Sequence, residues 1–228
     1  HGVFKSNDDF KYYYPSNVLV TGKDILYFWV AKMIMMSLYI TGEIPFNKVL
    51  LHCMVRDDKG NKMAKSKGNV IDPLDIIDKF GTDAMRYTLM YNLSLGNDIG
   101  ISIKSFDIGK TFCTKLWNAS RYIFMNVDMN LYNKSNVVFD NYYDKWILIK
   151  FNNIVEKYEK YIKEFNFSNA LKELSDFFWN DFCNMYLEIA KINNNDNTKR
   201  ILLLLLSNII QMYHPITPFI TESIWLQL

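Results

Sequence analysis

In the first part of the chain, hydrophobic runs of strand length alternate with an apolar stretch of helical period. The β-branched run at 17–22 ends in Gly22, and Asp24 is predicted to cap a helix over 24–41. Within that helix an apolar stripe is spaced to be buried; it consists of Trp29, Met33, Met36 and Tyr39. The run 48–55, KVLLHCMV, is continuously apolar and predicts a second strand. Strand, helix and strand in succession predict a βαβ unit, whose parallel sheet is covered on both faces.

Further along the chain the apolar positions recur with a helical period. Asp72 and Pro73 mark the start of a helix and Gly81 marks its end, and a second short helix is predicted over 82–92. After a turn-rich connector at 95–102, longer helices follow, separated by polar breaks rich in turn formers. They are predicted at 106–130, 142–165, 168–192 and 198–213, with a last helix from Pro218. This part of the chain is therefore predicted to be a helical bundle.

These patterns predict two domains of different classes, one α/β and one all-α. Residues 1–105 are expected to form the α/β domain and residues 106–228 the helical one. Half of the residues are hydrophobic and 22% are charged, which is typical of a globular chain. The formal net charge is only +2, so any surface for nucleic acid must concentrate its cations locally.

The cysteines and the most apolar stretch bear on the cellular compartment of the chain and on whether it meets a membrane. The three cysteines lie far apart and form neither a disulfide framework nor a CxxC metal pair, so we expect buried thiols in a reducing compartment. The stretch 25–40 has 16 residues and contains Lys32, whereas a membrane span needs ~20 apolar residues. We therefore expect no membrane partner. The chain opens with neither a start methionine nor a signal peptide, so we expect a piece of a larger protein.

Four lysines gather in the segment 57–73, DDKGNKMAKSKGNVIDP, directly after the second predicted strand. They are Lys59, Lys62, Lys65 and Lys67. Taken alone, a run of lysines is typical of a solvated basic turn. In parallel sheets, however, ligands bind beyond the carboxyl ends of the strands, where this segment begins. Its position therefore favours binding of a polyanion.

The lysine segment and three others resemble one known family. Residues 62–66, KMAKS, resemble the KMSKS motif of the class I aminoacyl-tRNA synthetases, and KGNVIDP is the usual sequel in the branch for branched aliphatic amino acids. Three segments resemble the valyl-tRNA synthetases at the corresponding places: TGKDILYFWVAKMIMM, KLWNASRYIFMN and HPITPFITESIW. Leucyl and isoleucyl relatives share the motif and the ending, but DILYFWVA favours the valyl family. Ala64 replaces the middle serine of the motif, and a lost neutral hydrogen bond is worth only ~1 kcal/mol.

The resemblance implies ATP-dependent ligation of valine to its tRNA through a valyl-adenylate. Negative charge then builds on the departing pyrophosphate, where positioned cations stabilise the transition state. By resemblance Lys65 contacts ATP, Lys62 is a second cation and Ser66 donates a hydrogen bond. Lys59 and Lys67 are interpreted as solvated charges. The sequence shows no cluster of metal ligands, so Mg²⁺ is expected to arrive with the nucleotide.

The resemblance also locates part of the amino-acid pocket. Asp24 would suit the α-ammonium group of valine, and Ile25 and Trp29 would suit its side chain. From the residues alone, the alternative is that Asp24 is a helix cap and Trp29 a core residue. For His52 two interpretations stay open, a contact with ATP or a packed strand histidine near the adenine.

By resemblance the chain is the second half of a Rossmann-like nucleotide-binding fold followed by a helical anticodon-binding domain. Four tryptophans of the helical half are interpreted as core residues rather than base-stacking platforms; they are Trp117, Trp146, Trp179 and Trp225. Five cations are candidates for the tRNA backbone: Lys110, Lys115, Arg121, Lys199 and Arg200.

Two alternative functions stay open, an isoleucyl- or leucyl-tRNA synthetase and a non-catalytic tRNA-binding module derived from such an enzyme. The HIGH motif and the editing domain of the family have no counterpart in this sequence, so we expect the chain alone to be inactive. The expected partners are ATP, valine and a valine-accepting tRNA. We expect a cytoplasmic monomer, with an organelle as the open alternative.

Overall fold

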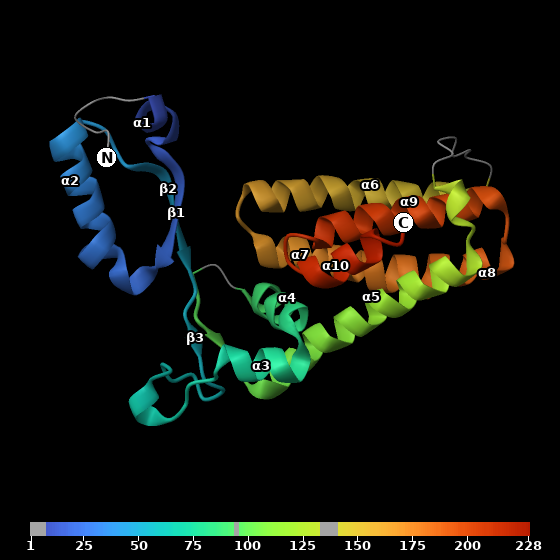
Figure 1. The fold of residues 1–228 in the computed structure, drawn as a ribbon, viewed down its shortest axis with the longest axis horizontal. Helices are drawn as coiled ribbons and strands as arrows, with labels where there is room; N and C mark the ends of the chain where they lie inside the picture. Colours follow the sequence, from blue (N-terminus) through green and yellow to red (C-terminus); the bar gives the residue numbers. More distant parts are fainter. Residues whose placement is uncertain (1–7, 94–95, 133–140) are drawn as a thin grey trace. The chain divides into compact units, whose positions relative to one another are not determined.

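The structure is a computed structural model, which describes residues 8–93, 96–132 and 141–228 (Figure 1). The described residues divide into two compact units. One holds the residues up to Lys62 together with 96–100, and the other holds Met63–Leu93 and Ile101–Leu228. The lysine segment therefore contributes to both units, with Lys62 in the first and Lys65 in the second.

The first unit contains the predicted βαβ arrangement, preceded by the short helix α1 (Asp8–Tyr13). Strands β1 (Ser16–Gly22) and β2 (Phe46–His52) pair in parallel, with Gly22 opposite His52 at their carboxyl ends. Between the strands the chain is helical in three successive forms. They are the 3-10 turn η1 (Lys23–Ile25), the π-helical η2 (Leu26–Val30) and the α-helix α2 (Ala31–Thr41). Gly42, left-handed at φ 76°, ends α2 and allows the chain to return to β2.

The single strand predicted at 48–55 is two strands in the structure. β2 ends at His52, and β3 (Val55–Arg56) pairs in parallel with β4 (Ile99–Gly100) in a separate sheet. The change of partner takes place at Met54, whose N–H donates to Oδ1 of Asp98 at 3.3 Å. The carbonyl oxygen of Met54 in turn accepts from the N–H of Ile99 at 3.0 Å. The apolar run is continuous through this switch, so the sequence pattern does not reveal it.

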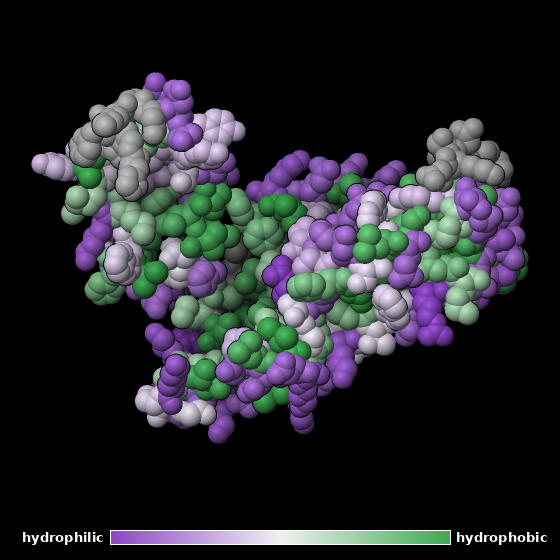
Figure 2. All heavy atoms as spheres, viewed as in Figure 1, coloured by the Kyte–Doolittle hydropathy of each residue, from purple (hydrophilic) through white to green (hydrophobic). Residues whose placement is uncertain are grey.

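The apolar stripe predicted to be buried in the first unit is exposed. Trp29 is 60% exposed and Tyr39 is 86% exposed, and Val30 is the only buried residue of Lys23–Thr41. Figure 2 shows hydrophobic residues at the surface of this part of the chain. The prediction failed because two strands offer the helix little surface to cover its apolar side chains. By length and composition alone, the 19 helical residues Lys23–Thr41 could also cross a membrane. The core helices of soluble proteins meet the same two criteria.

The second unit is helical, as predicted. α3 (Pro73–Phe80) begins after Asp72, whose carboxylate accepts from the N–H of Leu74 at 2.9 Å. The later helical elements are α4 (Thr82–Asn92), η4 (Ile103–Phe106), α5 (Asp107–Asn126), η5 (Met129–Leu131), α6 (Tyr142–Lys163), α7 (Phe167–Asp176), η6 (Phe177–Tyr186), α8 (Leu187–Ile192), α9 (Asp196–Tyr213) and α10 (Pro218–Trp225). The helix predicted at 168–192 thus runs through α7, the π-helical η6 and α8.

The second unit packs around a set of aromatic rings. The ring of Tyr87 on α4 stacks on that of Phe112 on α5, with centroids 4.0 Å apart and an interplanar angle of 9°. Phe112 also contacts Tyr213 on α9, at 4.6 Å between centroids. Gly109 lets α4 and α5 approach, because a Cβ there would lie 2.1 Å from the carbonyl oxygen of Ala84. Such ring pairs are worth ~0.5–1.5 kcal/mol beyond the area they bury.

Two charged residues of α4 hold α10 and the turn that precedes it. The buried carboxylate of Asp83 accepts a hydrogen bond from the N–H of Ile220 at 2.6 Å, in the first turn of α10. Arg86, one turn further along α4, donates from Nε to the carbonyl oxygen of Ile216 at 2.8 Å and from Nη2 to that of Pro215 at 2.9 Å. Asp83 thus satisfies an N–H that the start of α10 leaves without a partner, and Arg86 satisfies two carbonyl oxygens of the turn between α9 and α10.

One buried carboxylate joins α6, η6 and α9. Asp144, 1% exposed, accepts from the hydroxyl of Tyr186 at 2.7 Å and from Nδ2 of Asn197 at 3.0 Å. Nδ2 of Asn141 donates to the same carboxylate at 2.8 Å, and Oγ1 of Thr198 lies 3.4 Å from both of its oxygens. Burial, and then the neighbouring carboxylate, raise the pKa of Tyr186 far above its ordinary value, so its hydroxyl stays a donor.

The variant Asp144→Ala should strongly destabilise the second unit. It leaves the Tyr186 hydroxyl inside the protein without its acceptor, and each unsatisfied buried group costs about 1–3 kcal/mol. We expect the free energy of unfolding to fall by about 3 kcal/mol or more, measured by urea denaturation followed by circular dichroism. Glu156→Ala, on the exposed side of α6, is the matched control and should change stability by about 0.5 kcal/mol or less. Equal unfolding midpoints for both variants would contradict the role of Asp144.

Candidate functional site

Two predicted site residues of the first unit, Asp24 and His52, lie at the carboxyl ends of β1 and β2. A Cβ on Gly22 would lie 2.8 Å from Oδ1 of Asp24 and 3.6 Å from Cε1 of His52. Glycine therefore lets both side chains approach the end of β1. Nδ1 of His52 is hydrogen-bonded to the carbonyl oxygen of Cys53 at 2.9 Å. The structure thus brings a predicted amino-acid-binding residue close to a predicted ATP-binding one.

Asp24 also pairs with Lys62, the first lysine of the motif. Oδ2 of Asp24 lies 3.6 Å from Nζ of Lys62, with 45% and 68% of the two side chains exposed. Exposed ion pairs contribute only about 0–1 kcal/mol, so a ligand separates such charges at little cost. The prediction that Asp24 caps the helix is wrong, because it lies inside η1, whose capping residue Gly22 makes no side-chain bond.

Lys62 extends from a tight turn that begins at Arg56. Arg56 and Lys62 form an antiparallel bridge, and the N–H of Asp57 donates to the carbonyl oxygen of Asn61 at 3.0 Å. The carboxylate of Asp57 accepts from the N–H of Asn61 at 2.7 Å. Gly60, at φ 79°, takes the left-handed conformation that the tip of the turn requires. Backbone and side-chain bonds therefore fix the turn that carries Lys62.

Asp98 anchors this turn and is not among the site residues that the sequence predicts. Oδ2 of Asp98 lies 2.6 Å from both Nε and Nη2 of Arg56, and Oδ1 lies 2.9 Å from Nζ of Lys23. Hydrogen bonds from Lys23 and then Arg56 lower the pKa of Asp98 to about 2. The sequence signal for a strand after Asp98 is the alternating apolar pair Ile99 and Ile101. The turn formers around Asp98 favour a loop instead, so the signal is weak.

The other predicted motif residues lie in the second unit. Lys65, Ser66 and Lys67 form the 3-10 turn η3 (Lys65–Lys67), and all three are exposed. The N–H of Lys67 donates to the carbonyl oxygen of Ala64 at 3.0 Å, and the N–H of Ala64 donates to Oδ1 of Asn69 at 2.9 Å. The turn is therefore compact, and it presents two cations and a hydroxyl to solvent.

Ile25 and Trp29, the predicted contacts for the valine side chain, follow Asp24 on the helical stretch of the first unit. Ile25 is 39% exposed and Trp29 is 60% exposed. The alternative that Trp29 is a core residue is wrong for the described part of the chain. Both side chains offer apolar surface next to the carboxylate of Asp24, and their role in substrate binding stays a prediction.

In the second unit, the interpretation of the tryptophans as core residues is wrong for two of them. Trp117 and Trp225 are each 42% exposed, whereas Trp146 packs partly buried against the core. Trp117 and Arg121, one turn apart on α5, line a cavity of about 200 Å³. Its other lining residues are Ser120, Phe124, Met125 and Gln227. An exposed indole beside a guanidinium is an arrangement suited to stacking on an unpaired base.

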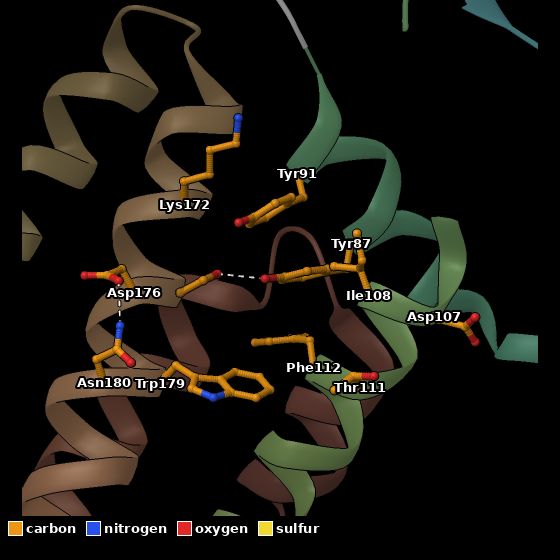
Figure 3. Close-up of a pocket in the computed structure, with 11 residues that line it drawn as sticks. Tyr87, Tyr91, Asp107, Ile108, Thr111, Phe112, Lys172, Asp176, Trp179 and Asn180 are labelled. Atoms are coloured by element: carbon orange, nitrogen blue, oxygen red, sulfur yellow. Dashed lines mark hydrogen bonds between the residues drawn. The ribbon is translucent and has the colours of Figure 1, made fainter. Parts of the chain in front are cut away.

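A cavity of about 490 Å³ lies between α4, α5, α7 and η6 (Figure 3). In it the hydroxyl of Tyr87 is hydrogen-bonded to Oγ of Ser175 at 2.8 Å, and Lys172 lies over the ring of Tyr91 at 5.5 Å. Trp179 points toward the interior of this cavity, and Lys115, a candidate for tRNA contact, lies 5.3 Å from the centre of its ring. Lys115 and Lys172 are therefore engaged with aromatic rings of the bundle itself.

Two family models match this chain in order along its length. The model described as tRNA synthetases class I (I, L, M and V) matches residues 1–102, and the one described as the anticodon-binding domain of tRNA ligase matches residues 144–228. The chain belongs to the class I tRNA synthetases. The predicted fold, part of a Rossmann-like domain followed by a helical bundle, is thereby confirmed.

Relatives of this class I synthetase include valine–tRNA ligases. It is 43% identical to that of Lactiplantibacillus plantarum over 97% of its length and 41% identical to that of Dehalococcoides mccartyi over 96%. It spans about a quarter of these relatives, 26% and 25% of their lengths.

Solved structures share the fold at low identity. A Mycobacterium tuberculosis methionyl-tRNA synthetase in complex with methionyl-adenylate matches 97% of this class I synthetase and 46% of that chain, with a TM-score of 0.78 and 20% identity. A LeuRS–tRNA–LeuAMS complex of Agrobacterium radiobacter matches 93% of it and 27% of that chain, with a TM-score of 0.72 and 20% identity.

Acid should loosen the first unit of this synthetase through Asp98. Because its folded pKa of about 2 is below the ordinary value of 3.8, its stabilising effect is complete above about pH 4 and is lost as the pH falls toward 2. The protection of the β3 and β4 amides against hydrogen exchange, corrected for the intrinsic pH dependence of exchange, should therefore fall over this window. In Asp98→Asn the same amides should exchange fast already at pH 5. An unchanged acid response in the variant would show that other carboxylates control it.

Proposed function

We propose that this chain is the part of a valine–tRNA ligase that carries the lysine segment 57–73 and the anticodon-binding bundle. The observation that carries the proposal is the identity of 41–43% to valine–tRNA ligases along nearly the whole chain. A leucyl enzyme is not favoured, because the likeness to the LeuRS complex comes with only 20% identity. The chain spans a quarter of the length of these relatives, and the ligase activity is proposed for the whole protein of which it is a part.

In the proposed reaction, the carboxylate of valine attacks the α-phosphate of ATP and expels pyrophosphate, and the valyl group then passes to tRNA. Lys65 and Lys62 stabilise the charge that develops on the pyrophosphate, and Ser66 donates a hydrogen bond to it. The exposure of Lys65 and Ser66 on η3 supports this role, since the turn can close over a bound nucleotide. His52, which lies opposite Gly22 at the carboxyl ends of the two strands, is proposed to lie near the adenine.

The amino-acid side of the proposed site is the carboxylate of Asp24 with the apolar surface of Ile25 and Trp29. Asp24 receives the α-ammonium group of valine in exchange for its weak pairing with Lys62. That exchange frees Lys62 for the phosphates. Asp24 and Lys62 are thus paired with each other until substrates bind, which keeps both charges satisfied in the meantime.

Mg²⁺ is proposed to enter with ATP. Within residues 8–93, 96–132 and 141–228 no group of three His, Cys, Asp or Glu side chains could hold a metal ion.

The second unit is proposed to bind the anticodon arm of valine tRNA. Trp117 offers a stacking surface on α5, and Arg121 is exposed one turn later to meet a phosphate. Lys110 is a weaker candidate, because it lies 6.0 Å from the ring centre of Phe80. The small net charge of +2 indicates that few phosphates are contacted.

The variant Lys65→Ala tests the reaction in the full-length protein, restored from the flanking coding sequence. A charge-assisted contact made in the transition state is worth about 1.5–3 kcal/mol, so valine-dependent pyrophosphate exchange should slow roughly 10- to 150-fold. Lys67→Ala, on the same turn, should have a much smaller effect and is the matched control. Equal losses in both would mean that the turn acts only as diffuse charge. This chain by itself should give no exchange.

The variant Trp117→Ala tests tRNA binding by the chain itself. Because base stacking is worth about 1–3 kcal/mol, the affinity for fluorescently labelled valine tRNA should fall roughly 5- to 150-fold. Ile192→Ala, an exposed apolar control on α8, should leave it unchanged. A transcript with a swapped anticodon should bind wild type more weakly, and the salt dependence should be shallow. Equal binding of both transcripts would leave only non-specific affinity for polyanions.

A further inference from the structure

Asp98 lies where three separate segments of the first unit meet. Its side chain is only 11% exposed and contacts Lys23, directly after β1, and Arg56, in β3. Its Oδ1 also accepts from the N–H of Met54 at 3.3 Å, at the point where the chain leaves β2 for β3. The lysine turn is the turn 56–62, which carries Lys62. A single carboxylate thus connects the ends of β1 and β2, which build the candidate site, with the start of the lysine turn.

The contact with Arg56 extends to the tip of the lysine turn. While Nε and Nη2 of Arg56 point at Asp98, its Nη1 donates to the carbonyl oxygen of Gly60 at 3.3 Å. The planar guanidinium therefore bridges the carboxylate and the turn, which a lysine at this position cannot do in the same geometry. Through Arg56, the position of Asp98 determines where the turn lies against the strands.

The contact with Lys23 leads to the other side of the site. Lys23 is the neighbour in sequence of Asp24, and Asp24 pairs with Lys62 on the lysine turn at 3.6 Å. The contacts therefore form a closed ring that runs from Asp98 through Arg56 to the turn and Lys62, and back through Asp24 and Lys23. Asp98 is the acid of this ring that contacts both Lys23 and Arg56.

We propose that Asp98 is a positioning residue of the adenylate-forming site, which holds Asp24 and Lys62 at the separation that the reaction needs. The inference rests on the proposed function. Asp98 touches no substrate in this arrangement; it acts through Arg56 and Lys23. Removing its charge leaves two neighbouring cations without their shared acid, so the turn moves while the local positive charge increases.

This arrangement predicts a specific kinetic signature for Asp98→Asn in the full-length protein. Since added positive charge attracts ATP, the KM for ATP should not rise. Since a misplacement of about 1 Å can cost 10²-fold, kcat for valine-dependent pyrophosphate exchange should fall roughly 10- to 100-fold. Arg56→Lys should show the same pattern, and Asp98→Glu should recover part of the rate. Asp58→Asn, an exposed acid in the same turn, is the matched control and should leave kcat and KM near wild type.

A second measurement separates positioning from unfolding. In this chain, hydrogen exchange at residues 57–62 should accelerate in Asp98→Asn and not in Asp58→Asn, while α5 to α9 exchange as in wild type. Equal kcat values for Asp98→Asn and Asp58→Asn would overturn the inference, as would a fall in kcat without faster exchange at 57–62. A wild-type protein without valine-dependent exchange would instead refute the proposed function, which is a distinct outcome.

Discussion

The hydrogen bonds from α4 to the segment 215–220 are the interaction on which the order of the second unit depends. Asp83 and its partner Phe219 are 136 positions apart, so this contact closes nearly the whole unit. The two carboxylate oxygens of Asp83 accept from the N–H groups of Phe219 and Ile220, which have no acceptor within α10. α4 itself follows α3 after the single residue Gly81.

Both units use the same physical device, a carboxylate that satisfies groups far away in the sequence. Asp98 does so for the strands of the first unit, and Asp83 and Asp144 do so for helices of the second. None of these acids stands out in the sequence, because an acid is most often a surface residue. Their importance follows from low exposure together with several donors directed at one group, and only a structure gives both.

The local elements could be predicted from the sequence, because the period of the apolar positions fixes helix or strand without knowledge of partners. The sites where that approach failed depend on tertiary partners. The run 48–55 changes sheet at Met54, whose N–H donates to Asp98. Trp29 and Trp117 are exposed, although their spacing suits a core. Asp24, His52 and Lys62 were identified through a family resemblance, but their mutual proximity needed the register of β1 against β2.

Gly109 shows how a position without any chemistry can be restricted to one residue type by packing alone. An added methyl group there would overlap the carbonyl oxygen of Ala84 and lie 2.7 Å from Oγ1 of Thr88. Both atoms belong to α4, the helix whose Asp83 and Arg86 hold α10 and the turn before it. In a saturation library, residue 109 should therefore accept glycine alone, whereas its exposed neighbour Ile108 should accept most side chains. The tolerance of this sequence to substitution is thus governed by the distance between two helices as much as by the reaction it is proposed to serve.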